Sequence, residues 1–386
     1  MNLRSALPWA AITASTLALS ACVANTADAA GSIAVSSSDD ACEVSTTETA
    51  SGTVSFSVTN DGTDVTEFYL LAADGLRIIS EVENIGPGLT RDLVVQIGPG
   101  DYYTACKPGM VGEGIQAPFT VTDSGADLGP TGERGDLLDQ ASTDYEAYVR
   151  DQVSILVAKT VEFVSAYTAG DDDAARSIYA DARVHWERIE PVAEAFGDLD
   201  PSMDLREADL AVGEEWTGWH HMEKNLWPPA EGYALTEAER TALGDRLVAD
   251  TTELAARVNA EDFSVEAFQI GNGAKELLDE VASGKITGEE EIWSGTDLWD
   301  FQANLDGALV AFEVLRPAAD LTDPALGEEI DGRFAALQSL LSDHGSIEDG
   351  FSSYDELSDA EVIELARLVD ALGESLSRLT ATAVSA

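Results

Sequence analysis

Residues 123–136 read DSGADLGPTGERGD, and this stretch separates two parts of the chain that follow different hydrophobic patterns. It is rich in glycine and aspartate and has no periodic apolar residues, which is typical of a linker. The residues before it form short apolar runs, whereas those after it place apolar side chains at helical spacing. We therefore expect two domains: a small all-β domain at residues 32–122 and an all-α domain at residues 137–386.

The part before the linker has the pattern of a β-sandwich. Val54, Phe56 and Val58 alternate with polar residues, as in a strand with one buried face. Further apolar runs follow at residues 68–71, 76–79, 93–97 and 119–121. Gly-Pro-Gly turns at 86–88 and 98–100 lie between some of these runs. Many short strands joined by such turns indicate two packed sheets.

The part after the linker predicts helices throughout. The first apolar stripe ends at Gly170, and Asp171 is a suitable N-cap for a second helix that Pro191 interrupts. A third helix is expected at residues 205–227. Later helices are expected at residues 243–258, 263–281, 298–315, 330–341 and 361–379. Consecutive amphipathic helices of this kind form an up-and-down bundle, or two fused bundles.

The N-terminus has the pattern of an export signal. Arg4 precedes an apolar run at residues 6–19, which is shorter than the about 18 to 20 residues a membrane span needs. The run ends in Leu-Ser-Ala-Cys, so we expect a signal peptide at residues 1–21, lipid on Cys22 and a tether to residue 31. The alternative is an ordinary signal peptide followed by an incidental cysteine. Either way the protein is exported, to the periplasm or to the outer face of the cytoplasmic membrane.

The charge balance is strongly acidic. The 386 residues include 72 acidic and 21 basic side chains, a formal net charge of −51. Such a surface repels nucleic acids and anionic lipid headgroups, which argues against both as partners. It attracts cations, although acids spread along the whole chain are also typical of a salt-adapted surface.

The expected third helix holds the sharpest chemical signal. Glu223 falls on its apolar stripe, and His220 lies one turn earlier and flanks the same face. A carboxylate that faces a bundle interior is costly unless it is paired, protonated or bound to a metal. Helical bundles hold metals with imidazole and carboxylate groups one turn apart. The pair therefore indicates a metal site, or else a His–Glu hydrogen bond at a helix surface.

Acids near this helix could complete such a site. Glu187 and Glu190 lie one turn apart, and Asp204 follows in a loop, although the two glutamates could equally lie on a solvated helix face. Oxygen ligands with one imidazole suit iron, manganese or zinc. His185 shares a stripe with apolar residues and is expected in the core, whereas His221 points away from His220 and is expected at the surface.

Several other classes of site are disfavoured. The chain lacks the His-Glu-x-x-His of zinc peptidases, the Gly-x-Ser-x-Gly of hydrolases and a phosphate-binding loop, so we expect no enzyme of these kinds. In the β domain the candidates are Cys42, Glu67 and Cys106. No histidine precedes His185, so a blue-copper centre cannot form there. The two cysteines then form a disulfide or a two-cysteine metal site.

Longer segments resemble a known family. The pattern Gly218-x-His220-x-x-Glu223 is similar to the signature of the imelysin family. HWERIEPVAEAFGDLD at 185–200, GAKELLDEVASGKITG at 273–288 and TDLWDFQAN at 296–304 closely resemble its EfeO-type members. Segments of the β domain, such as ENIGPG at 83–88, are similar to the cupredoxin-like domain that some of these members carry. The resemblance covers essentially the whole expected mature chain.

The resemblance implies an extracytoplasmic, monomeric iron-binding component of an EfeUOB-type uptake system, without enzymatic activity. Its partners would be a membrane iron permease and a haem peroxidase. The implied iron ligands, for Fe³⁺ or Fe²⁺, are His220 and Glu223, with Glu187, Glu190 and Asp204 nearby. A second metal, with copper as one option, is implied at Cys42, Glu67 and Cys106. Thr104 stands where a related domain has a methionine, which favours a plain disulfide.

Two alternatives remain open. A surface lipoprotein could bind polysaccharide or a partner protein and hold metal in a structural role. A redox role of the β domain, oxidising ferrous iron at Cys42 and Cys106, would require both thiols to be free.

Overall fold

The computed structural model describes residues 32–384, except 111–113, 126–127, 197, 211–212, 214, 231 and 284. The expected signal peptide, Cys22 and the tether lie outside the described residues. The strands β1 to β9 lie between residues 33 and 122, and the helices α1 to α11 lie between residues 133 and 384. The predicted order of an all-β domain and an all-α domain is therefore confirmed.

The β domain consists of two packed sheets. The strands are β1 (Ile33–Ser38), β2 (Ala41–Val44), β3 (Glu48–Ala50), β4 (Gly52–Asn60), β5 (Thr66–Leu71), β6 (Ile78–Ile85), β7 (Thr90–Ile97), β8 (Gly100–Cys106) and β9 (Ile115–Thr122). One sheet has the order β2-β1-β4-β7 and the other β3-β9-β8-β5-β6. Phe56 of the first sheet packs against Phe68 and Phe119 of the second, with ring centroids 5.2 and 5.6 Å apart. These aromatic contacts form the sandwich core.

A disulfide joins the two sheets. Cys42 on β2 bonds to Cys106 on β8 across 64 residues of sequence. Of the two alternatives for these cysteines, the structure therefore contains the disulfide. While it is intact, neither sulfur is a thiolate, so the two-cysteine metal site and thiol-based iron oxidation have no ligands to use.

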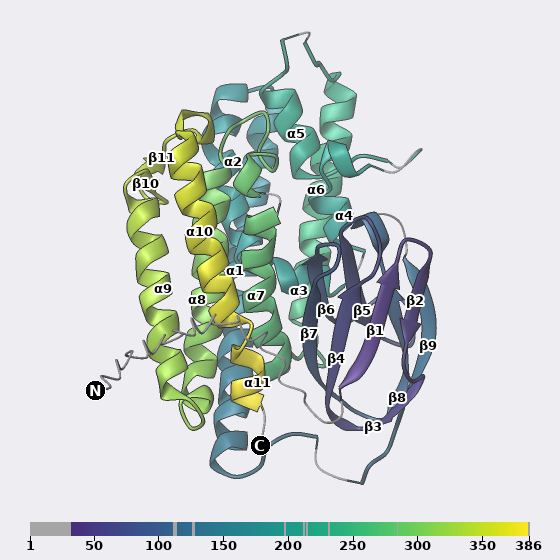
Figure 1. The fold of residues 1–386 in the computed structure, drawn as a ribbon. Coiled ribbons are helices and arrows are strands. Elements are labelled where there is room, and N and C mark those ends of the chain that lie inside the picture. The colour runs from purple at the N-terminus through teal and green to yellow at the C-terminus, as the bar shows by residue number, and fades with distance from the viewer. Residues whose placement is uncertain are drawn as a thin grey trace, which may run out of the picture.

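The helical domain is a bundle of long helices (Figure 1). Its helices are α1 (Glu133–Ala169), α2 (Asp172–Glu187), α3 (Glu190–Glu194), α4 (Asp200–Met203), α5 (Trp219–Leu226), α6 (Glu237–Val258), α7 (Ala267–Ser283), α8 (Asp297–Ala319), α9 (Pro324–Ser342), α10 (Asp359–Leu376) and α11 (Leu379–Val384). As predicted, Gly170 ends α1 with a positive φ, and the Asp171 side chain caps α2. Two-residue strands β10 (Gly345–Ser346) and β11 (Gly350–Phe351) form a small hairpin between α9 and α10. The described residues also form the short 3₁₀ turns η1 (Pro108–Met110), η2 (Glu207–Asp209), η3 (Lys285–Thr287) and η4 (Tyr354–Glu356).

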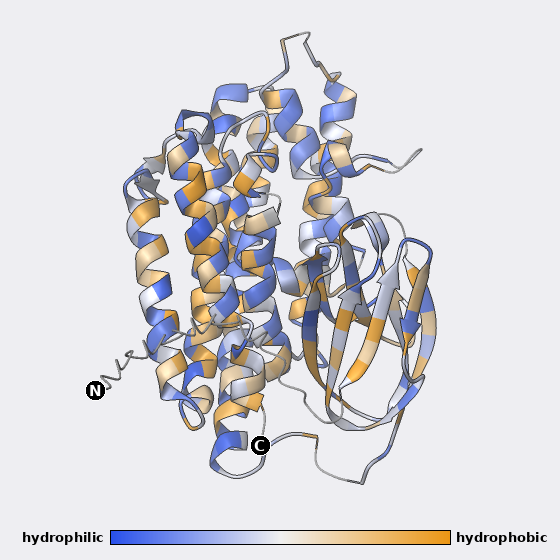
Figure 2. Ribbon diagram, in the orientation of Figure 1, coloured by the Kyte–Doolittle hydropathy of each residue, from blue (hydrophilic) through white to orange (hydrophobic). Residues whose placement is uncertain are grey.

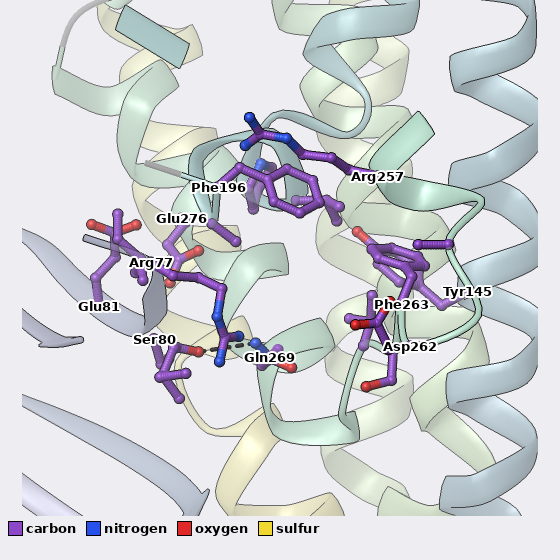
Figure 3. A pocket seen from close by; sticks show the side chains of 18 residues that line it. Arg77, Ser80, Glu81, Tyr145, Phe196, Arg257, Asp262, Phe263, Gln269 and Glu276 are labelled. Atoms are coloured by element: carbon purple, nitrogen blue, oxygen red, sulfur yellow. Dashed lines mark hydrogen bonds between the residues drawn. The ribbon is translucent and has the colours of Figure 1, made fainter. Parts of the chain in front are cut away.

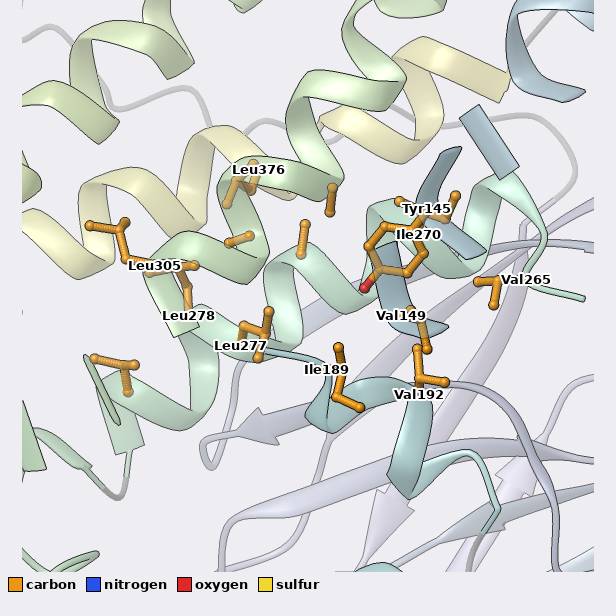
Figure 4. Packing of buried hydrophobic residues seen from close by; sticks show 14 of the residues in the cluster. Tyr145, Val149, Ile189, Val192, Val265, Ile270, Leu277, Leu278, Leu305 and Leu376 are labelled. Carbon is orange, nitrogen blue, oxygen red and sulfur yellow. The ribbon is translucent and has the colours of Figure 1, made fainter. Parts of the chain in front are cut away.

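Apolar side chains from many helices meet inside the bundle. Figure 4 shows residues of α1, α7, α8 and α10 packed together, among them Tyr145, Leu277, Leu305 and Leu376. The helices remain mixed in hydropathy along their length (Figure 2). No helix in the described part of the chain is long and apolar enough to cross a membrane.

The continuous helix expected at residues 205–227 is wrong. Among the described residues, the short turn η2 ends at Asp209 and the eight-residue helix α5 begins only at Trp219. Gly213 and Gly218 have φ values of 91° and 84°, which a helix cannot contain. A Cβ on Gly218 would overlap the backbone carbonyl of Met203, so this glycine lets α5 begin directly against α4.

The two domains are docked through polar contacts between α7 and the edge of the sandwich (Figure 1). The Asn272 side chain donates hydrogen bonds to Ser80 Oγ at 2.8 Å and to the Val94 carbonyl at 3.0 Å. Gln269 donates to the Ile79 carbonyl at 3.0 Å. One face of α7 thus forms hydrogen bonds with the backbone of both β6 and β7.

Asn272→Ala is expected to weaken this docking. The substitution removes both donors and leaves the Val94 carbonyl without its side-chain partner, which should cost about 1–3 kcal/mol of unfolding free energy. Chemical denaturation of the exported chain measures the loss. Asn259→Ala, at the exposed end of α6, is the matched control and should change stability much less.

Candidate metal centre

A buried arginine lies at the middle of a cluster of acids inside the bundle. Arg183 on α2 is fully buried. Its guanidinium pairs with Asp204 after α4, with Glu187 one turn along α2, and with Glu291, where Nε and Oε1 are 2.7 Å apart. Asp300 on α8 lies 3.7 Å from the same Nε. Glu290 lies 3.7 Å from the guanidinium as well, so one cation faces five carboxylates from four segments of the chain.

His220 lies beside this arginine with both ring nitrogens unsatisfied. It is fully buried, and neither nitrogen has a hydrogen-bond partner among the described residues. Nε2 is 3.4 Å from Asp204 and 3.3 Å from Glu290. Nδ1 is 3.6 Å from Glu223 and 3.8 Å from Glu291. Each ring nitrogen of His220 therefore faces two carboxylates, one pair on either side of the ring.

These contacts form two groups that share His220. Asp204, His220 and Glu290 make one group, and His220, Glu223 and Glu291 make the other, with the ligand atoms of each group within 4.8 Å of one another. All are buried. One imidazole and two carboxylates are a donor set that iron, manganese and zinc accept in helical bundles.

Glu223 is oriented by backbone groups. Its Oε1 accepts hydrogen bonds from the amides of Trp293 and Ser294, at 3.0 and 2.7 Å. Its Oε2 is buried, has no partner in the described part of the chain and points toward His220. The carboxylate is thus held by one oxygen and presents the other, which is how a preformed metal ligand is positioned.

The charges of the cluster are strongly coupled. Burial and the Arg183 charge lower the pKa of His220, but the surrounding carboxylates raise it well above its ordinary value. Burial raises the pKa of Glu291 well above its usual range, and the Glu223 charge adds to the rise. Burial would also raise the pKa of Glu290, but the nearby His220 ring and the Lys285 charge hold that pKa low. Without a metal, protons and built-in cations neutralise the site.

Glu187 and Glu190 already have a cationic partner. The Lys285 ammonium, 2% exposed, lies 2.6 Å from Glu187 and 3.1 Å from Glu190, and it also contacts Glu280 and Asn304. Both glutamates are buried, so the alternative of a solvated helix face is wrong. They form a third acidic group with Asp204, but the Lys285 ammonium already pairs with two of its three members.

The chain is similar to known proteins over most of its length. A family model described as Imelysin, of the Peptidase M75 class, matches residues 141–379. The chain belongs to the imelysin family. The Iron uptake system component EfeO of Yersinia pestis is 35% identical over 350 residues, covering 90% of each chain. The protein of the same name from Escherichia coli O157:H7 is 34% identical over 369 residues, covering 93% of each. These matches identify the chain as an EfeO-type imelysin.

A third relative, the EfeO of Yersinia pseudotuberculosis serotype I, is 36% identical over 357 residues, or 90% of each chain. A crystal structure of a Parabacteroides distasonis protein, described as a precursor of iron-regulated protein A, covers 67% of this chain and 97% of that one with a TM-score of 0.49 and 18% identity. That likeness is too distant to bear on the site.

Five residues that the sequence predicted for one site lie together in the candidate metal centre, and other residues of the centre were not predicted. His220, Glu223, Glu187, Glu190 and Asp204 do converge. The missed residues are Arg183, Lys285, Glu290, Glu291 and Asp300. A usable signal was the acidic run Glu289-Glu290-Glu291, because Ile292 and Trp293 follow it and large apolar residues favour a partly buried segment over a solvated loop.

The other histidines lie outside the centre. His185 is buried against Gln152, at 2.8 Å, as expected for a core residue, and burial lowers its pKa to about 4. His221 was expected at the surface, which is wrong: it is half-buried, stacks on Trp216 and bonds to the Tyr233 hydroxyl at 2.7 Å. It therefore braces α5.

Glu67, the third candidate in the β domain, is also buried. Tyr69 donates a short hydrogen bond to its carboxylate, and Lys107 lies 3.7 Å away. Burial raises the pKa of Glu67, while Lys107 opposes the rise. Because both cysteines are in the disulfide, Glu67 interacts with Tyr69 and Lys107 instead of sharing a metal site with the cysteines.

Proposed function

We propose that this EfeO-type imelysin is the extracytoplasmic iron-binding component of an EfeUOB-type uptake system, capturing iron in the bundle and delivering it to a membrane permease. The observation that carries the proposal is the buried His220, whose two nitrogens lack partners and face two pairs of carboxylates. The curated relatives, similar over nine-tenths of their length, are named iron uptake system components.

The donor set suits iron as cargo. Carboxylate oxygens are hard ligands, and imidazole is shared by iron, zinc and manganese sites. The ligands we assign are His220 with Asp204 and Glu290 on one side, and Glu223 and Glu291 on the other. Glu187 and Glu190 act by holding Lys285, whose charge offsets the acids around the ion.

The proposal also covers where the protein is located and which partners it has. Export by the leader at residues 1–21 and lipid on Cys22 would keep the protein at the membrane that carries the permease. A haem peroxidase of the same system is the second proposed partner. The role requires binding and release without bond chemistry, and no peptidase step is proposed for the site.

Iron titration of the exported chain tests the assignment. Wild type is compared with His220→Ala/Glu223→Ala and with His344→Ala/Glu348→Ala, which removes the same residue types from the β10–β11 hairpin. We expect the first variant to lose one equivalent of tightly bound iron, because it removes a ligand from each group, and the control to keep it. Circular dichroism confirms that both variants are folded.

Equal iron binding by wild type and the His220/Glu223 variant would show that another part of the acidic surface binds the metal. In that case the site assignment is wrong. Absence of tight iron binding in all three proteins would contradict the proposed function itself.

A further inference from the structure

A second set of acids lies between the two domains, away from Arg183 and His220. Glu81 on β6 and Glu276 on α7 line the same cavity of about 510 Å³, and Figure 3 shows both at one end of it. They come from different domains and lie near the polar contacts that Asn272 makes with Ser80. The cavity is therefore part of the domain interface.

Both carboxylates are buried without a partner. Glu81 is 6% exposed and Glu276 is 7% exposed. Neither forms a hydrogen bond or a close ion pair with any described residue, although the charge of Lys107 acts on Glu81 and that of Lys275 on Glu276. Buried carboxylates normally have such partners, because an unpaired buried charge is costly. Their position, facing a cavity across an interface, points to a ligand that is positively charged.

The neighbouring elements add more acids than bases. Glu67, Glu83 and Asp200 line a second cavity, of about 740 Å³, that Glu81 also borders. Lys107 lines it as well, but its ammonium is 3.7 Å from Glu67. Arg257, at the first cavity, is paired with Asp198. Arg77 also lines the first cavity, from an exposed position, and could compete there with a cation.

The raised pKa values of the two carboxyl groups agree with this geometry. Burial raises the pKa of Glu276 to about 8. Burial also raises the pKa of Glu81 well above its ordinary value, and the Glu276 charge adds to the rise. Two like charges across the interface repel each other unless a proton or a cation lies between them.

We propose that Glu81 and Glu276 hold a partly hydrated divalent cation that bridges the β domain to the helical domain. Two carboxylates with water completing the shell is the arrangement that small hard cations accept. The bridging ion fastens the sandwich to α7, the helix that ends next to Lys285 of the iron centre. This inference does not rest on the proposed iron function, since it concerns other residues.

Mn²⁺ is the probe, and free Mn²⁺ is followed by electron paramagnetic resonance. The background is the full exported chain with His220→Ala/Glu223→Ala, so that the bundle centre contributes nothing. To this background Glu81→Gln/Glu276→Gln is added, which preserves shape and removes the charges. The matched control adds Glu43→Gln/Glu328→Gln, exposed acids of the same two domains.

We expect the background and the control to bind one Mn²⁺ at least about tenfold more tightly than the Glu81/Glu276 variant. Mn²⁺ should also raise the melting temperature of the background and the control but not of that variant. Arg77→Gln should strengthen binding by removing a competing charge. Because glutamine relieves like-charge repulsion, the test variant should fold.

Equal Mn²⁺ affinity and stoichiometry with and without Glu81 and Glu276 would overturn the proposal. If the His220/Glu223 background unfolds, the same substitutions in the wild-type chain give the answer by a loss of one bound Mn²⁺. Failure of iron binding at His220 would leave this result unchanged, so the two proposals can fail separately.

Discussion

Arg183→Met is expected to lower the free energy of unfolding by about 3–5 kcal/mol, the range for removing one partner of a buried ionic network. The guanidinium is fully buried and pairs with Asp204, Glu187 and Glu291. Methionine fills similar volume but leaves these acids facing each other in a low-dielectric interior. Urea denaturation of the exported chain, without added metal, measures the loss.

The control is Arg316→Met. Arg316 pairs with Asp331 and Asp320 near the surface, where solvent screens the charges, so its replacement should matter far less. Added iron should restore part of the stability of Arg183→Met, because a cation can take over the charge compensation. Similar losses for the two variants would show that the buried acids are not held charged by Arg183.

Lys285→Met is expected to produce a comparable loss with a distinct pH dependence. Burial raises the pKa of Glu187 and Glu190 above their ordinary values, and the Lys285 charge opposes the rise. Removing the ammonium raises both pKa values further. A carboxyl whose pKa is higher in the folded than in the unfolded state binds its proton more tightly when folded, so the folded state loses stability as pH rises through the folded pKa.

The deficit of Lys285→Met relative to wild type should therefore be larger at about pH 8 than at about pH 5. Denaturation curves at both pH values measure it. The matched control is Lys275→Met, whose partially exposed ammonium pairs with Asp279 on α7. A deficit of Lys285→Met that is constant with pH would contradict the assignment of Lys285 as counter-charge to these two glutamates.

The sequence predicted the domains well because each has its own hydrophobic period. The alternation at Val54, Phe56 and Val58 and the caps at Gly170 and Asp171 depend on neighbouring residues only, and all are found in the structure. The helix at residues 205–227 was wrong for the same reason. Its apolar residues fit a helical spacing by chance, while Gly213 and Gly218 already indicated positive φ.

The centre was predicted in part because His220 and Glu223 lie on one helix, where spacing shows which residues share a face. Glu290 and Glu291 come from a loop without periodicity, so only the tertiary fold brings them to His220. Arg183 and Lys285 do not belong to the patterns that predict metal ligands, because such ligands are acids and imidazoles. The cations that make such a cluster of acids tolerable do not follow from ligand patterns.

The two internal cations have a consequence for how the protein works over repeated cycles. Small metal-dependent folds lose their structure when the ion leaves, because nothing else balances the ligands. Here Arg183 and Lys285 remain among the acids whether or not an ion is present. We therefore expect the empty protein to stay folded, so that under the proposed function it gives up its ion and binds another without refolding. Under the proposed function, iron is then cargo that the bundle binds and releases, and the fold does not depend on it.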